Sequence, residues 1–193
     1  NGIVANKEIE YAKSKGLTVL VLDHHMPGKI LPPADALVDP HIHPLKNGFA
    51  GYCGAGLAYK LAQMMSDNKD LLYMLSSLVA IGTVADVVPL ISDNRVIVQR
   101  GLRAMADRQV PKGLLAILDV LKLRTLDEQA LGFYLGPMLN ASGRLLDDGA
   151  DLAFRTLTSK NYTEAVVHAE HMRTLSRERK NLVTGKREQI VKE

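Results

Sequence analysis

The stretch LTVLVLDHH, residues 17–25, decides the fold of this chain. Its first six positions are apolar or β-branched and MPG at 26–28 closes it, a pattern typical of a buried strand. Asp23, His24 and His25 therefore stand where a strand ends, which is where ligands bind in open α/β sheets. A carboxylate beside two imidazoles offers oxygen and nitrogen ligands to a divalent cation such as Mn²⁺ or Zn²⁺. A turn of solvated polar residues explains the triplet equally well.

The neighbouring segments extend the strand into an α/β unit. Ala5–Lys15 has helical spacing of apolar residues, with Gly16 placed as a C-terminal cap, and Ala36–Asp39 predicts a second short strand that Pro40 stops. Beyond Tyr52 helical periodicity dominates, and we expect no strand after about residue 90. The fold class is therefore α/β at the front, followed by a mainly helical part. The predicted helices of that part are Ala55–Met65, Leu71–Ile81, Asn94–Ala106, Gly113–Leu121 and Ala130–Leu135.

Composition limits the class of protein. The chain has 193 residues, a formal net charge of +3 and a pI of about 9.0, which suits one domain plus a linker and is compatible with a nucleic-acid partner. Its single Cys53 excludes an internal disulfide and fits a reducing compartment. Neither a signal peptide nor the roughly 20 apolar residues of a membrane span is visible, so we expect a cytoplasmic protein without a membrane partner.

The last segment, residues 161–193, alternates charges of both signs and loses apolar positions toward its end. This pattern favours a solvated connector helix, and a nucleic-acid contact along it is the alternative. His168 and His171 on this segment are predicted to be surface residues. The chain starts at Asn1-Gly2-Ile3 without a methionine and ends in a helix without a stop signal, so we expect a piece of a longer protein.

A second acidic residue, Asp86, interrupts the apolar stretch IGTVADVVPL at 81–90. A charge in such a run is usually paired or bound to metal. A helix N-cap or a structural ion pair accounts for Asp86 as well as a metal site does. Gly82 in the same stretch permits a close backbone approach.

Three further groups of residues are candidates for binding. The stretch GPMLNASGR at 136–144 is predicted to be a loop whose Asn140 and Arg144 could hold a phosphate, with a plain helix-joining turn as the alternative. The stretch GYCGAG at 51–56 opens a helix and favours tight packing of small residues, with Cys53 as a packed thiol. His41 and His43 could chelate a metal, although loop histidines without such a role are more common.

In this order, four stretches resemble the DHH phosphoesterase superfamily and, within it, the RecJ-type single-strand-specific exonucleases. They are DHH at 23–25, CGAGLAYKL at 53–61, GTVADVVPL at 82–90 and LNASGRL at 139–145. The resemblance implies that residues 1–160 are the C-terminal part of a parallel-sheet DHH catalytic domain. Residues 161–193 would be the connector helix toward a DHH-associated domain.

The resemblance also implies roles for single residues. His24 and Asp86 would be direct ligands of a Mn²⁺ or Mg²⁺ ion, and Asp23 a ligand or a close support. His25, with Asp23 the expected catalytic pair, would face the scissile phosphate. Substrate phosphates would be held by Asn140 and Arg144. The implied reaction is hydrolysis of a phosphodiester at two metal ions, proceeding from the 5′ end of single-stranded DNA.

The chain also departs from the family pattern. Two earlier aspartate motifs are not found, and Asn1-Gly2 looks like the tail of the second, so we expect the chain by itself to be inactive. Met138 stands where RecJ-type sequences often have a basic residue, which puts one phosphate contact in doubt. Two alternatives stay open, namely a DHH-type phosphatase or oligonucleotide hydrolase with small substrates, and an inactive RecJ-like DNA-binding scaffold. A single-strand binding protein is a further expected partner.

Overall fold

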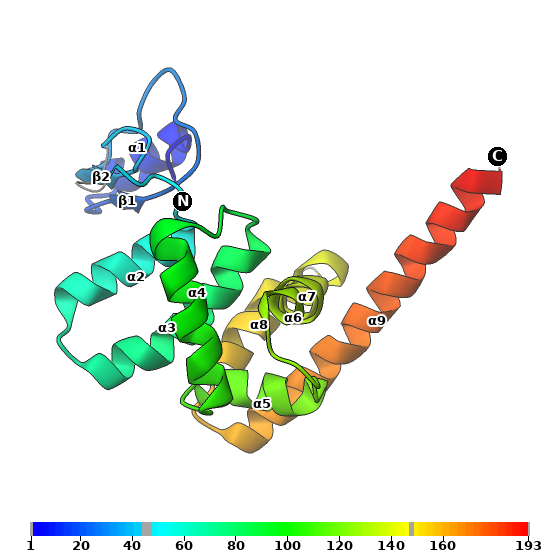
Figure 1. Cartoon of the computed structure of the whole chain (residues 1–193). Coiled ribbons are helices and arrows are strands. Elements are labelled where there is room, and N and C mark those ends of the chain that lie inside the picture. Colours follow the sequence, from blue (N-terminus) through cyan, green and yellow to red (C-terminus); the bar gives the residue numbers. More distant parts are fainter. Residues whose placement is uncertain (1, 44–47, 147–148, 193) are drawn as a thin grey trace.

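The computed structural model describes residues 2–43, 48–146 and 149–192; Asn1, residues 44–47, residues 147–148 and Glu193 lie outside these ranges. A small α/β unit sits on a larger helical body, from which one long helix projects (Figure 1). The elements of the α/β unit are α1 (Asn6–Ser14), β1 (Leu20–Leu22) and β2 (Ala36–Val38). The helical body consists of α2 (Gly54–Met65), α3 (Lys69–Ala85), α4 (Ser92–Ala106), α5 (Lys112–Leu121), α6 (Glu128–Ala130), the π-helical turn η1 (Leu131–Leu135), α7 (Gly136–Leu145), α8 (Gly149–Thr158) and α9 (Tyr162–Lys192).

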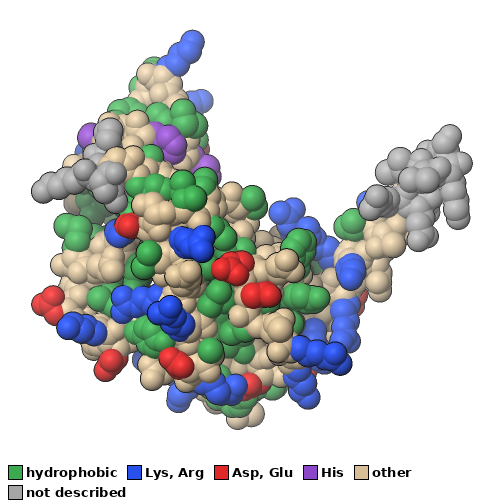
Figure 2. Space-filling model, in the orientation of Figure 1, with side chains coloured by type: hydrophobic (Ala, Val, Ile, Leu, Met, Phe, Trp, Pro, Cys, Tyr) green, Lys and Arg blue, Asp and Glu red, His purple; other side chains and the backbone are tan. Residues whose placement is uncertain are grey.

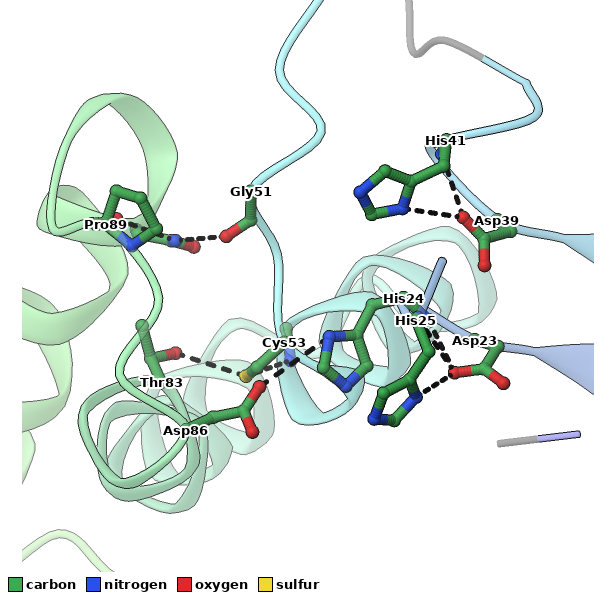
Figure 3. A network of polar contacts seen from close by, with 12 residues as sticks. Asp23, His24, His25, Asp39, His41, Gly51, Cys53, Thr83, Asp86 and Pro89 are labelled. Carbon is green, nitrogen blue, oxygen red and sulfur yellow. Dashed lines mark hydrogen bonds and ion pairs between the residues drawn. The ribbon is translucent and has the colours of Figure 1, made fainter. Parts of the chain in front are cut away.

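The two strands form a parallel pair in which Leu20 lies opposite Ala36 and Leu22 opposite Val38. Helix α1 ends as predicted at Gly16, which has φ +79° and donates its N–H to the Lys13 carbonyl. This cap turns the chain directly into β1. The carboxyl ends of both strands therefore point to the same edge of the sheet, next to α2 and α3 (Figure 3).

The predicted buried strand at 17–22 is shorter and more exposed than expected. It begins at Leu20, and directly before it the Val19 N–H donates to the Asp35 side chain at 2.8 Å. Only Val21 is buried, beside Ile9 of α1, whereas Leu20 is 72% exposed. The α/β class and the absence of strands after residue 90 are confirmed within the part of the chain that the structure describes.

The main core lies in the helical body, between α3, α4, α5, η1, α7 and the first half of α9. Its largest fully buried apolar side chains are Leu114, Ile117, Leu131, Leu135, Met138 and Met172. The expectation of a solvated connector is wrong for the first half of α9, because Ala165, Ala169 and Met172 are fully buried there. Their spacing, i to i+4 and i+7, forms an apolar stripe that the many charges of the segment conceal. The described part of α9 beyond Ser176 is mostly exposed.

The predicted loop at 136–144 is wrong, because these residues form α7. Pro137 lies at the start of α7, directly after the π-helical turn, which continues without interruption into this helix. The sequence pattern does not predict helix α8. Across the described ranges, no helix combines the length and the apolar character needed to span a membrane.

Candidate metal centre

Asp23 follows β1 and is almost completely buried, with 1% of its surface exposed. Its Oδ1 accepts the backbone N–H groups of His24 at 2.7 Å and His25 at 3.2 Å, which is an Asx-turn. Its Oδ2 accepts the backbone N–H of Ile3 at 2.8 Å. The carboxylate thus ties the end of β1 to the start of the chain and sets the direction of the two histidines.

Burial by itself would raise the pKa of Asp23. The hydrogen bonds from Ile3, His24 and His25 outweigh this effect and hold the pKa well below its usual range, so the carboxylate is ionised. The His25 Nδ1 lies 2.7 Å from Asp23 Oδ1, and an ionised carboxylate can only accept, so Nδ1 carries the proton. The neutral form of His25 then presents Nε2 as an acceptor on a ring that is half exposed.

His24 and Asp86 approach each other from two different parts of the fold. Asp86 is the C-cap residue of α3, not the N-cap considered from the sequence, and its Oδ2 lies 3.6 Å from His24 Nδ1 (Figure 3). The His24 ring also contacts the His25 ring, with centroids 4.2 Å apart and the ring planes tilted by 42°. The structure therefore brings Asp23, His24, His25 and Asp86 into one cluster, as the sequence predicted.

The approach of α3 to this cluster depends on small residues. A Cβ at Gly82 would lie 2.8 Å from Ala55 Cβ, and one at Gly54 would lie 3.7 Å from His24 Cδ2. Cys53 is the N-cap of α2, where its thiol accepts the Gly56 N–H at 3.3 Å and lies 3.6 Å from the Thr83 hydroxyl. The prediction of tight small-residue packing around a packed thiol is confirmed.

Helix α3 ends immediately after Asp86 in a strained backbone. Val87 has φ +58°, which is the left-handed region, and its side chain is 86% exposed. A β-branched residue in this region costs on the order of 1–3 kcal/mol. The strained residue directly follows a candidate metal ligand, and strained backbone conformations are often found at functional sites.

The cluster suits a divalent cation. Ligand atoms of Asp23, His24 and His25 all lie within 4.8 Å of one another. Two atoms that share one ion at about 2.1 Å stand roughly 3.0–3.4 Å apart, so the gap of 3.6 Å between His24 and Asp86 needs only a small contraction. Both oxygens of Asp23 already accept hydrogen bonds, which favours a supporting role for this residue.

The two predicted phosphate-binding residues lie on one stripe of α7. Asn140 and Arg144 are exposed and one helical turn apart, and Gly136, one turn earlier, packs where its Cβ would lie 3.2 Å from Ala85 Cβ. The stripe therefore starts beside the residue that precedes Asp86. Met138 is buried in the core. It therefore does not provide the phosphate contact that a basic residue at this position would make.

Sequence reasoning missed a second Asx-turn at the end of β2. Asp39 is fully buried, and its Oδ1 accepts the His41 N–H at 2.8 Å and lies 3.1 Å from His41 Nδ1. The signal was present in the sequence, because an Asp followed two residues later by a His stands after both strands. His43, exposed, is not brought into a metal-ligating group among the described residues.

Most of the chain is similar to known proteins. Residues 1–83 match the DHH family, N-terminal domain. Single-stranded-DNA-specific exonuclease RecJ of Escherichia coli (strain K12) is 36% identical over 96% of this chain and 34% of its own length. The RecJ of Bacillus subtilis (strain 168) is 37% identical over 95% of this chain and 23% of its own length.

Solved structures give the same result. The crystal structure of RecJ in complex with Mn²⁺ from Thermus thermophilus superposes with a TM-score of 0.87 at 28% identity, over 100% of this chain and 29% of that one. A crystal structure of exonuclease RecJ bound to manganese gives 0.82 at 30% identity, over 96% and 47%.

Residues 1–83 are therefore similar to the DHH family, N-terminal domain, and most of the chain is similar to RecJ exonucleases. The chain spans about a third of the length of the first of these RecJ relatives.

Proposed function

We propose that this chain is the metal-binding part of a 5′-to-3′ exonuclease that hydrolyses single-stranded DNA. The observation that carries the proposal is the pairing of His24 with Asp86 at 3.6 Å, across the junction between the sheet and α3. The likeness to RecJ proteins, two of which were solved with manganese, supports the choice of reaction and of Mn²⁺ or Mg²⁺. The division into a catalytic part at 1–160 and a connector at 161–193 belongs to the same proposal.

His24 and Asp86 would hold the ion, and Asp23 would orient the imidazoles rather than bind directly. When bound, such an ion lowers the pKa of a coordinated water and stabilises charge on a phosphoryl oxygen. His25 would face the scissile phosphate with Nε2, since its Nδ1 proton is committed to Asp23, and a second proton on Nε2 would let the ring donate to a phosphate oxygen. Asn140 and Arg144 would hold phosphates along α7, where an Arg fork can bind a phosphate through two hydrogen bonds.

A Mn²⁺ titration followed by electron paramagnetic resonance tests the ligand assignment. We expect weak binding of one ion by this chain and loss of that binding in His24→Ala and Asp86→Asn. His171→Ala, which removes an exposed histidine on α9, is the matched control and should bind as the wild type does. Unchanged Mn²⁺ affinity in His24→Ala would contradict the assignment.

The activity is tested in a protein that carries this chain at the length of its RecJ relatives. Release of mononucleotides from 5′-blocked and 3′-blocked single strands gives the direction of cleavage, and Asp86→Asn should abolish release. Hydrolysis of dinucleotides alone would favour the small-substrate alternative. Strand binding without any hydrolysis would favour the scaffold. Cytoplasmic location and recruitment by a single-strand binding protein stay predictions.

A further inference from the structure

A groove with aromatic and basic walls lies between η1 and α9. It consists of two adjoining hollows of about 330 and 510 Å³, and we call it the η1–α9 groove. The residues common to both hollows are Phe133, Tyr134, Ser176 and Lys180; Arg177 lines the first hollow only. The groove is separate from the cluster around His24.

The aromatic wall is unusually open to solvent. Phe133 is 75% exposed and Tyr134 is 56% exposed, whereas Met138 at the start of α7 is buried. Leu131 and Leu135 of the same turn are fully buried in the core. The turn therefore presents its two rings outward while its leucines anchor it, which gives a rigid surface on which nucleobases could stack.

The opposite wall is basic. Lys and Arg side chains follow α9 along the side of the body (Figure 2). Arg173 is held in place by Glu170 at 2.6 Å and by the Val120 carbonyl at 3.2 Å. In contrast, Arg177 and Lys180 form no ion pair with any residue that the structure describes. Their charges are available to a ligand that carries negative charge.

The groove is also connected to the candidate metal centre. A Cβ at Gly132 would lie 3.4 Å from the Val84 side chain, and one at Gly136 would lie 3.2 Å from Ala85 Cβ. Both contacts are on the last turn of α3, directly before Asp86. One side of the η1–α7 segment therefore packs beside the metal centre while the neighbouring side forms the groove.

We propose that the η1–α9 groove binds single-stranded nucleic acid, with bases stacked on Phe133 and Tyr134 and phosphates held by Arg177 and Lys180. The proposal rests on the proposed function, because it describes where the strand lies on its way to the metal centre. An acidic peptide with apolar side chains would also match the charges. Continuity with Asp86 through η1 favours the nucleic acid.

The test is fluorescence anisotropy with labelled oligo-dT, measured in EDTA so that metal coordination contributes nothing. Loss of one stacked base by Phe133→Ala should weaken binding by on the order of tenfold. Phe154→Ala, which removes an equally exposed ring from α8, is the matched control and should leave affinity unchanged. Circular dichroism on both variants establishes that each is folded.

Two further measurements separate stacking from a merely structural effect. On an abasic strand of equal length, Phe133→Ala and the wild type should bind alike. Lys180→Ala should reduce the slope of log K against log salt by about 0.7, the value for one lost phosphate contact on a single strand, whereas Phe133→Ala should leave that slope unchanged.

Wild-type affinity for oligo-dT in both Phe133→Ala and Lys180→Ala would overturn the proposal. A second result would also overturn it: both variants keep their affinity for oligo-dT but no longer bind a peptide that contains Asp and Phe. The groove would then be a protein-docking site. The proposed function fails independently, through unchanged Mn²⁺ affinity in His24→Ala. That variant should still bind oligo-dT in EDTA.

Discussion

Substitution of Gly82 by alanine tests whether the fold sets the geometry of the candidate metal centre. The new methyl group would lie 2.8 Å from Ala55 Cβ, where α3 crosses the start of α2. Carbon atoms in contact prefer about 3.5–4.0 Å, so the two helices must separate by roughly 1 Å. Neither residue touches the proposed ion, and any effect on metal binding must therefore pass through the position of the helices.

The structure sets the size of the effect. Overpacking of this kind costs about 1–3 kcal/mol, and the better helix propensity of alanine returns up to about 1 kcal/mol, which leaves a net loss of about 1–2 kcal/mol. Helix α3 carries Asp86, and Gly54 of α2 lies against His24. The distance of 3.6 Å between these two ligands should therefore change, and misplacement of supporting residues lowers metal affinity about 10- to 100-fold.

Urea unfolding measures the loss of stability, and Mn²⁺ titration measures the change in metal affinity. The double variant Gly82→Ala/Ala55→Gly restores the space, because it moves the single methyl group from α2 to α3. We expect it to recover most of the Mn²⁺ affinity, with a coupling energy of about 1 kcal/mol or more between the two sites. Gly132→Ala is the control, because its methyl group would lie 3.4 Å from the Val84 side chain, which is an ordinary van der Waals contact. It should leave both the stability and the Mn²⁺ affinity nearly unchanged.

Two results would refute this reasoning. Wild-type stability in Gly82→Ala would mean that the helices have room that the structure does not show. Lost Mn²⁺ affinity that the double variant fails to recover would mean that the contact with Ala55 is not the route to the ligands.

Three other predictions concern the framework. Val87→Gly should stabilise the chain by about 0.5–1 kcal/mol in urea unfolding, because relief of the left-handed strain exceeds the added freedom of the unfolded chain, and a lower midpoint would contradict it. Gly113→Ala should cost more than about 3 kcal/mol, since its Cβ would lie 1.8 Å from the Thr156 carbonyl oxygen; a midpoint near the wild type's would show that α5 and α8 are not in backbone contact. The hydrogen bond from Lys60 holds the pKa of Asp93 below its usual range, so stability should fall as pH drops below about 4 toward that lowered pKa. This dependence should be weaker in Asp93→Asn, and an identical pH profile of the unfolding free energy would rule it out.

Helices α2 to α5 could be predicted from local pattern, because amphipathic spacing places each of these four within a few residues. The stretch at 136–144 could not. Its glycines and Pro137 are the usual marks of a loop, yet Gly136 is required for contact with Ala85 and Pro137 lies at the start of a helix that continues from the π-helical turn. The buried stripe of α9 was hidden for a similar reason, since three small or flexible apolar residues carry the packing among many charges.

The candidate site shows where local reasoning stops. An Asp after a strand predicts an Asx-turn, and this turn accounts for the direction of His25 relative to Asp23. The same turn recurs at Asp39, so it is a property of these strand ends and does not by itself define a metal site. The difference lies in His24, which reaches Asp86 because Gly82 lets α3 come close. Among the described residues, no carboxylate from a neighbouring helix approaches Asp39 or His41 in the same way. It follows that the packing of α3 against α2, rather than the DHH triplet alone, makes the first strand end a candidate metal centre.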